Sequence, residues 1–169
     1  MSRCLVWEDP DSRRRYALLS EPTNDSLTAQ RAAEAVIIRV WDSLRESRYH
    51  DPADAAYRAL ASAHQTVRRA NLLPGGQRRA ELGLVGASLC IIERDQMVVA
   101  IAAPAQTLIL QDDQLVAWPP LEDRRYEFAG DETPVDALPL GGGEFRPAVS
   151  ITQVLPGDRV LLCSDQVGE

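Results

Sequence analysis

The sequence contains no lysine, because all 18 of its basic residues are arginine. This absence excludes Schiff-base catalysis, a lysine general base and the lysine of a phosphate-binding P-loop. Aromatic residues are also scarce, at 5% of the chain, and no apolar run is long enough to span a bilayer. The N-terminus lacks the apolar core of a signal peptide. We therefore predict a cytoplasmic protein that does not enter a membrane.

The sequence contains only three cysteines, and it has fewer basic than acidic residues. Cys4, Cys90 and Cys163 are far apart, and two of them lie in apolar runs. This pattern favours buried free thiols in a reducing compartment over a redox or metal role. The net charge of −7 disfavours nucleic acid and anionic membrane surfaces as partners.

The order of the predicted elements indicates the fold class. Two strands around a turn come first, then two amphipathic helices, and then a series of short strands. The predicted strands and helices, in chain order, are strands at 2–8 and 14–19, helices at 26–45 and 51–71, strands within 82–118, and strands at 148–154 and 159–163. We interpret 119–146 as a long surface excursion. The chain is therefore predicted to be an α+β protein with an antiparallel sheet system, in a single domain over 1–169.

The end of the chain carries the most specific motif. Pro156-Gly157-Asp158 is typical of a turn, and Arg159–Cys163 follows as a short apolar strand. This strand delivers Ser164 and Asp165 to the point where it ends. A carboxylate at the end of a buried strand is either a metal ligand or the first residue of a loop.

This tail resembles a signature of the metal-dependent PPM (type 2C) serine/threonine phosphatases, in which a Pro-Gly-Asp turn and a strand precede Ser-Asp-Gly. Here Gln166 replaces the final glycine. The strands within 86–116 are similar to the central meander of the family, and 16–22 resembles its apolar strand that runs into Asp-Gly. The resemblance implies an antiparallel β-sandwich flanked by helices on both outer faces. It also implies that the last helix and strand of the family are lacking after Glu169.

In the family that the chain resembles, manganese or magnesium ions held by aspartates activate a water for attack on phosphate. Ser20-Glu21 stands where the family has Asp-Gly, and Ala103-Pro104-Ala105-Gln106 stands where it has Gly-Asp-Ser-Arg. Asp165 matches the aspartate of the tail signature. We interpret Asp165 as a turn aspartate that marks a vestigial metal position, with metal binding as the alternative. Glu21 is a weaker candidate for a metal ligand, because a one-residue shift turns a strand side chain to the other face.

Other polar residues give weaker signals. His50 and His64 have no second ligand at metal spacing and are predicted to be solvated or capping residues. Arg13-Arg14-Arg15 is interpreted as a solvated strand end, with phosphate binding as the alternative.

These observations predict a catalytically inactive PPM-like domain, a pseudophosphatase, with no catalytic residue and no cofactor. We expect it to act as a regulatory or scaffold subunit that binds another protein or itself through an incomplete sheet edge. The alternative is a divergent manganese- or magnesium-dependent phosphoprotein phosphatase that uses Glu21, Asp165 and one of the carboxylates of Glu8 and Asp9.

Overall fold

The structure is a computed structural model of the chain, and it describes residues 2–48, 50–72, 82–119, 126–128, 131–135 and 138–164. No helix within these ranges is long and apolar enough to cross a membrane. The elements, in chain order, are β1 (Arg3–Glu8), β2 (Arg15–Pro22), α1 (Leu27–Glu46), α2 (Pro52–Asn71), β3 (Val85–Glu93), β4 (Gln96–Ala102), β5 (Gln106–Gln111), β6 (Gln114–Ala117), β7 (Tyr126–Phe128), β8 (Asp131–Val135), β9 (Ala148–Gln153) and β10 (Arg159–Cys163).

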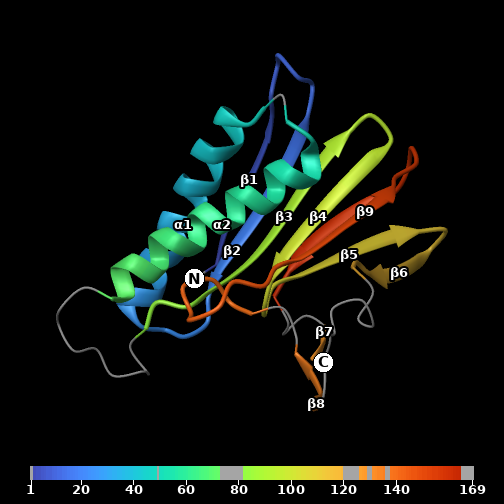
Figure 1. Cartoon of the computed structure of the whole chain (residues 1–169). Helices are drawn as coiled ribbons and strands as arrows, with labels where there is room; N and C mark the ends of the chain where they lie inside the picture. Colours follow the sequence, from blue (N-terminus) through green and yellow to red (C-terminus); the bar gives the residue numbers. More distant parts are fainter. Residues whose placement is uncertain are drawn as a thin grey trace.

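Two antiparallel sheets form a sandwich with the helices on one side (Figure 1). The larger sheet has the strand order β1-β2-β3-β4-β9, and the smaller has the order β10-β5-β6. A further pair, β7 and β8, forms a separate two-stranded sheet. This architecture confirms the predicted α+β class and the antiparallel sandwich.

The two helices begin where the sequence places capping residues. Ser26 Oγ accepts a hydrogen bond from the Ala29 backbone N–H at 3.1 Å, and Asp51 Oδ1 accepts one from Ala53 at 2.9 Å. Pro52 occupies the first turn of α2, where its missing N–H costs no helical hydrogen bond. The predicted helix bounds therefore agree with the structure to within one residue.

Both helices pack on the same face of the larger sheet, as Figure 1 shows. Leu18 of β2 and Leu89 of β3 are buried there against Val36 of α1 and Leu60 of α2. Among the described residues no helix covers the outer face of the smaller sheet, so the implied helices on both outer faces are corrected to one helical layer.

A second apolar core fills the space between the two sheets. Cys90, Met97, Val99 and Ile101 of the larger sheet meet Ile109 of the smaller sheet there. Because side chains alternate along a strand, β3 contributes to both cores. This alternation decides which polar side chains face the space between the sheets.

The segment before β9 is not the surface excursion that we expected throughout. Leu140 is fully buried and pairs with Val85 of β3 through an isolated bridge. The Asn71 side chain holds the next residue in place, because its Nδ2 donates to the Gly141 carbonyl at 3.0 Å. This correction has a physical cause, since a single apolar residue with a tight glycine turn gives no periodic signal in sequence.

Candidate functional site

The candidate site lies between the two sheets, at the end of the sandwich where β2 finishes. Ser20 does not face this space, because its hydroxyl donates to the Ala33 carbonyl of α1 at 3.0 Å. Glu21, the next residue, therefore lies on the inter-sheet face, opposite Gly86 of β3, and only 5% of it is exposed. The structure thus puts the carboxylate on the inter-sheet face and the serine on the helix side.

The turn between β4 and β5 closes this end of the sandwich. A Cβ atom added to Gly86 would lie 2.7 Å from Pro104 Cδ and 3.1 Å from the Ala105 backbone nitrogen. Ala105 itself is 1% exposed. The segment that replaces Gly-Asp-Ser-Arg therefore presents apolar groups and backbone next to Glu21.

A buried pair of hydroxyls lies one step further inside. Ser88 Oγ and Thr107 Oγ1 form a hydrogen bond between β3 and β5, and both residues are fully buried. Neither hydroxyl is recognisable as a site residue in the sequence, because Ser88 and Thr107 lie within apolar strands and carry no motif. The one signal in the sequence is that both residues lie within 86–116, the stretch that resembles the central meander of the phosphatase family.

The other predicted metal position, Asp165, comes two residues after the end of β10 in the sequence. Cys163 pairs with Gln106, so β10 ends beside the turn that carries Pro104. Asp165 lies outside the described residues. The roles of Asp165 and Glu21 as metal ligands therefore remain predictions.

Glu8 and Asp9 lie at the far end of the same sheet. Glu8 pairs with Arg15, six positions from Glu21 along β2, which corresponds to about 20 Å. Asp9 belongs to the hairpin turn, where Ser12 Oγ donates to its carboxylate at 2.6 Å and lowers its pKa. Neither carboxylate can join Glu21 in one metal site.

Manganese and magnesium require several oxygen ligands that converge on one point. Among the described residues, no three His, Cys, Asp or Glu side chains come together in a way that could hold a metal ion. The described part of the site offers one buried carboxylate, that of Glu21, and this set does not fit a two-metal centre.

Three further expectations are corrected by side-chain packing. His64 is 1% exposed rather than solvated, and its Nδ1 accepts a hydrogen bond from the Gly141 N–H at 3.2 Å. Arg14 is buried and forms an ion pair with Glu93 at 3.0 Å, so it is not a solvated strand end.

The third correction concerns the thiols. Cys4 is exposed, whereas Cys90 and Cys163 are buried as predicted.

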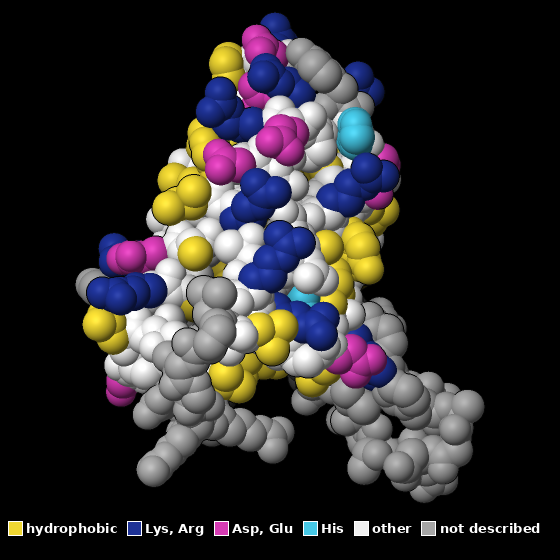
Figure 2. Space-filling view, turned by 60° about the vertical axis from the view of Figure 1, so that its left-hand side comes forward, with side chains coloured by type: hydrophobic (Ala, Val, Ile, Leu, Met, Phe, Trp, Pro, Cys, Tyr) yellow, Lys and Arg dark blue, Asp and Glu magenta, His cyan; other side chains and the backbone are white. Residues whose placement is uncertain are grey.

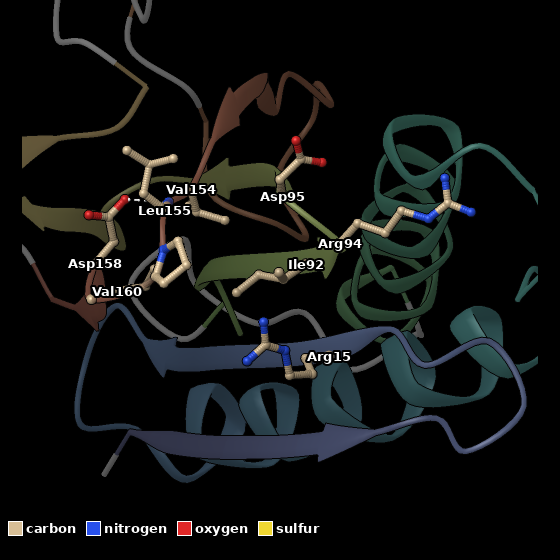
Figure 3. Close-up of a pocket in the computed structure, with 10 residues that line it drawn as sticks. Arg15, Ile92, Arg94, Asp95, Val154, Leu155, Asp158 and Val160 are labelled. Carbon is tan, nitrogen blue, oxygen red and sulfur yellow. Dashed lines mark hydrogen bonds between the residues drawn. The ribbon is translucent and has the colours of Figure 1, made fainter.

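A separate pocket of about 400 Å³ opens between the sheets at the opposite end from Glu21 (Figure 3). Its apolar lining includes Ile92, Val154 and Val160, and the Arg15 side chain points toward Ile92. The Asp158 carboxylate accepts hydrogen bonds from the Leu155 N–H and from Gln111 Nε2, each at 2.8 Å, which lower its pKa. The lining carries two arginines and two aspartates, so its charges balance.

The fold is shared with solved phosphatase structures. The catalytic domain of the serine/threonine phosphatase PstP in complex with two manganese ions matches with a TM-score of 0.70 and 13% identity, over 99% of this chain and 78% of that one. An S. agalactiae serine/threonine phosphatase matches with a TM-score of 0.72 and 10% identity, over 95% and 71%. PppA, a regulatory component of the type VI secretion system in Pseudomonas aeruginosa, matches with a TM-score of 0.67 and 17% identity, over 98% and 76%.

These matches show the fold alone: the chain has the fold of the PPM-type serine/threonine phosphatases. No protein-family model matches the sequence, and no curated protein matches it either. Because the identities are low, the comparison defines the fold and leaves the activity to the residues of the site.

The comparison also corrects the expectation that no cofactor is involved. A structure that covers 99% of this chain is a complex with two manganese ions. Manganese therefore belongs in any assay of this chain, although the described residues do not supply a complete ligand set. The expectation was wrong because it rested on missing carboxylates alone.

Proposed function

We propose that the chain is a catalytically inactive PPM-like domain that acts in the cytoplasm as a protein-binding regulatory or scaffold subunit. The observation that carries this proposal is the composition of the site end. Among the described residues there, Glu21 is the buried carboxylate, and the neighbouring Ala103-Pro104-Ala105 turn carries no charged side chain. Attack on a phosphoryl group requires positive charge or metal ions around its oxygens, and these groups supply neither.

Two of the similar structures support a regulatory role. PppA is described as a key regulatory component of its secretion system, and another match belongs to the bacterial stressosome, described as a modular system that controls secondary messenger signalling. The stressosome structure has a TM-score of 0.63 and 19% identity. The free thiols are consistent with a reducing compartment.

The outer face of the smaller sheet supports self-association as one form of protein binding. Leu161 of β10 is 47% exposed and pairs with Leu108, while Leu115 of β6 is 58% exposed and pairs with Leu110. These four leucines share one face, and β10 is an edge strand of the described sheet. Light scattering during size-exclusion chromatography would test this, because a monomer at every concentration would count against self-association.

The second candidate function is a divergent metal-dependent phosphatase, which the inter-sheet position of Glu21 favours. Hydrolysis of p-nitrophenyl phosphate and of a phosphoserine peptide, each with millimolar manganese, separates the two candidates. We expect the rate of the wild-type chain to equal the rates of Glu21→Gln and Asp165→Ala. Manganese-dependent hydrolysis that either substitution lowers by more than about tenfold would overturn the proposal.

A further inference from the structure

The helix side of the molecule carries a positively charged groove that the phosphatase-like fold does not explain. Figure 2, which turns this side forward, shows arginine side chains following one another down the middle of the face. A groove of about 500 Å³ lies between α1 and α2, and its lining consists of Arg39, Ala61, Ser62, Gln65, Thr66 and Arg69. No carboxylate is part of that lining.

The two arginines of this groove, Arg39 and Arg69, form no ion pair with a carboxylate among the described residues. Ion pairs engage other arginines, such as Arg58 with Asp54. In a chain of net charge −7, a groove with two such guanidinium groups is a local reversal of sign.

The groove is also partly ordered before any partner binds. Arg39 Nε donates to Ser62 Oγ at 2.7 Å, which fixes one guanidinium group of α1 against α2. Thr66 Oγ1 donates to the Ser62 carbonyl at 3.0 Å and so stays close to its own helix. Guanidinium groups that are held in place lose less side-chain entropy on binding than free ones.

We propose that this groove binds an acidic, carboxylate-rich segment of a partner protein. The inference rests on the proposed protein-binding function and names the chemistry of the partner. The groove is larger than a single carboxylate or phosphate group fills, and its two guanidinium groups stand on different helices. An extended segment with at least two carboxylates meets both groups at once, and Arg forms forked hydrogen bonds with carboxylates.

Fluorescence anisotropy with a labelled peptide of alternating aspartate and serine tests this inference. We expect binding that weakens as NaCl rises from about 50 to 200 mM, and no binding of the same peptide with asparagine in place of aspartate. The double variant R39Q/R69Q is expected to weaken binding by about tenfold or more. R45Q/R159Q is the charge-matched control, because both arginines are exposed and lie outside the groove, and it is expected to stay within about twofold.

A conservative double variant keeps the test valid if R39Q/R69Q does not fold. R39K/R69K keeps the charge and removes the fork, so we expect it to bind more weakly than the wild type and more tightly than R39Q/R69Q. Circular dichroism melts identify which variants are folded. If R39Q/R69Q is unfolded, the affinity of R39K/R69K for the peptide tests the inference in its place.

Several results would overturn the inference: no binding of the acidic peptide, equal losses in R39Q/R69Q and R45Q/R159Q, or displacement of the peptide by millimolar inorganic phosphate. Tighter binding of a single-stranded oligonucleotide through the same arginines would overturn it as well. If the acidic peptide does not bind and phosphate ester hydrolysis stays at the background rate, this inference fails and the proposed inactive function stands. Manganese-dependent hydrolysis defeats the proposed function and does not alter the peptide result.

Discussion

Gly86 and Pro104 are in direct contact across the inter-sheet end of the sandwich, since a Cβ on Gly86 would stand 2.7 Å from Pro104 Cδ and 3.0 Å from its nitrogen. This contact brings β3 against the turn that follows β4. It also explains why the turn lies close to Glu21, which is opposite Gly86 on β2. A glycine on β3 is therefore a packing requirement of this site.

Gly86→Ala is expected to destabilise the fold by about 1–3 kcal/mol, because the atoms that a Cβ would meet are ring and backbone atoms that cannot move independently. Gly143→Ala is the matched control, because a Cβ there meets nothing within 4 Å. Urea denaturation of both variants measures the difference. Equal stabilities would contradict the close packing of Gly86 against the turn.

The Ser88–Thr107 hydrogen bond links the two sheets, and both residues are fully buried. Ser88→Ala leaves the Thr107 hydroxyl buried without this partner, which is expected to cost about 1–3 kcal/mol. Thr107→Val leaves the Ser88 hydroxyl in the same situation. The double variant is expected to lose less unfolding free energy than the two single variants lose together. Denaturant melts of the wild type and the three variants give the coupling energy. Additive effects would show that the two hydroxyls do not stabilise each other.

His64 predicts a specific loss of stability at mildly acidic pH. Burial lowers its pKa below the ordinary value of 6.5, and the charge of Arg68 lowers it further. The unfolded chain therefore binds the proton more tightly than the folded chain, so stability is complete above about pH 6.5 and falls as the pH drops through that value.

His64→Gln isolates this effect, because glutamine can still accept the Gly141 hydrogen bond and does not titrate. Between about pH 7.5 and 5.5, the melting temperature of the wild type is expected to fall more than that of His64→Gln. Differential scanning fluorimetry across this range is sufficient, and parallel pH profiles would refute the assignment.

The thiols differ sharply in expected reactivity. Burial raises the pKa of Cys90 to about 12, and Cys163 is 7% exposed, whereas Cys4 is exposed on β1. Because the thiolate is the reactive form, we expect Ellman's reagent to label Cys4 rapidly in the native chain and Cys90 only after unfolding. Cys4→Ser should remove the fast phase, and a fast phase that persists in this variant would contradict the burial of the other two thiols.

The sequence predicted elements wherever a local pattern repeats. The periodicity of Val36 and Val40 in α1, and the cap formed by Asp51 and Pro52, located both helices. The resemblance in the meander and tail predicted the PPM-like sandwich, which the solved structures confirm. Local hydrogen bonding and apolar spacing determine these features, so they are readable along the chain.

The sequence by itself therefore determined the order of helices and strands, the antiparallel class and the depletion of carboxylates near the site. Only the tertiary structure decided that Glu21 and not Ser20 faces the inter-sheet space, that His64 is buried under Gly141, and that Arg39 and Arg69 share one groove. Each of these depends on residues far apart in the sequence, brought together by the packing of sheets and helices. Side-chain alternation and capping follow from the nearest neighbours along the chain, whereas burial and charge complementarity follow from the complete fold.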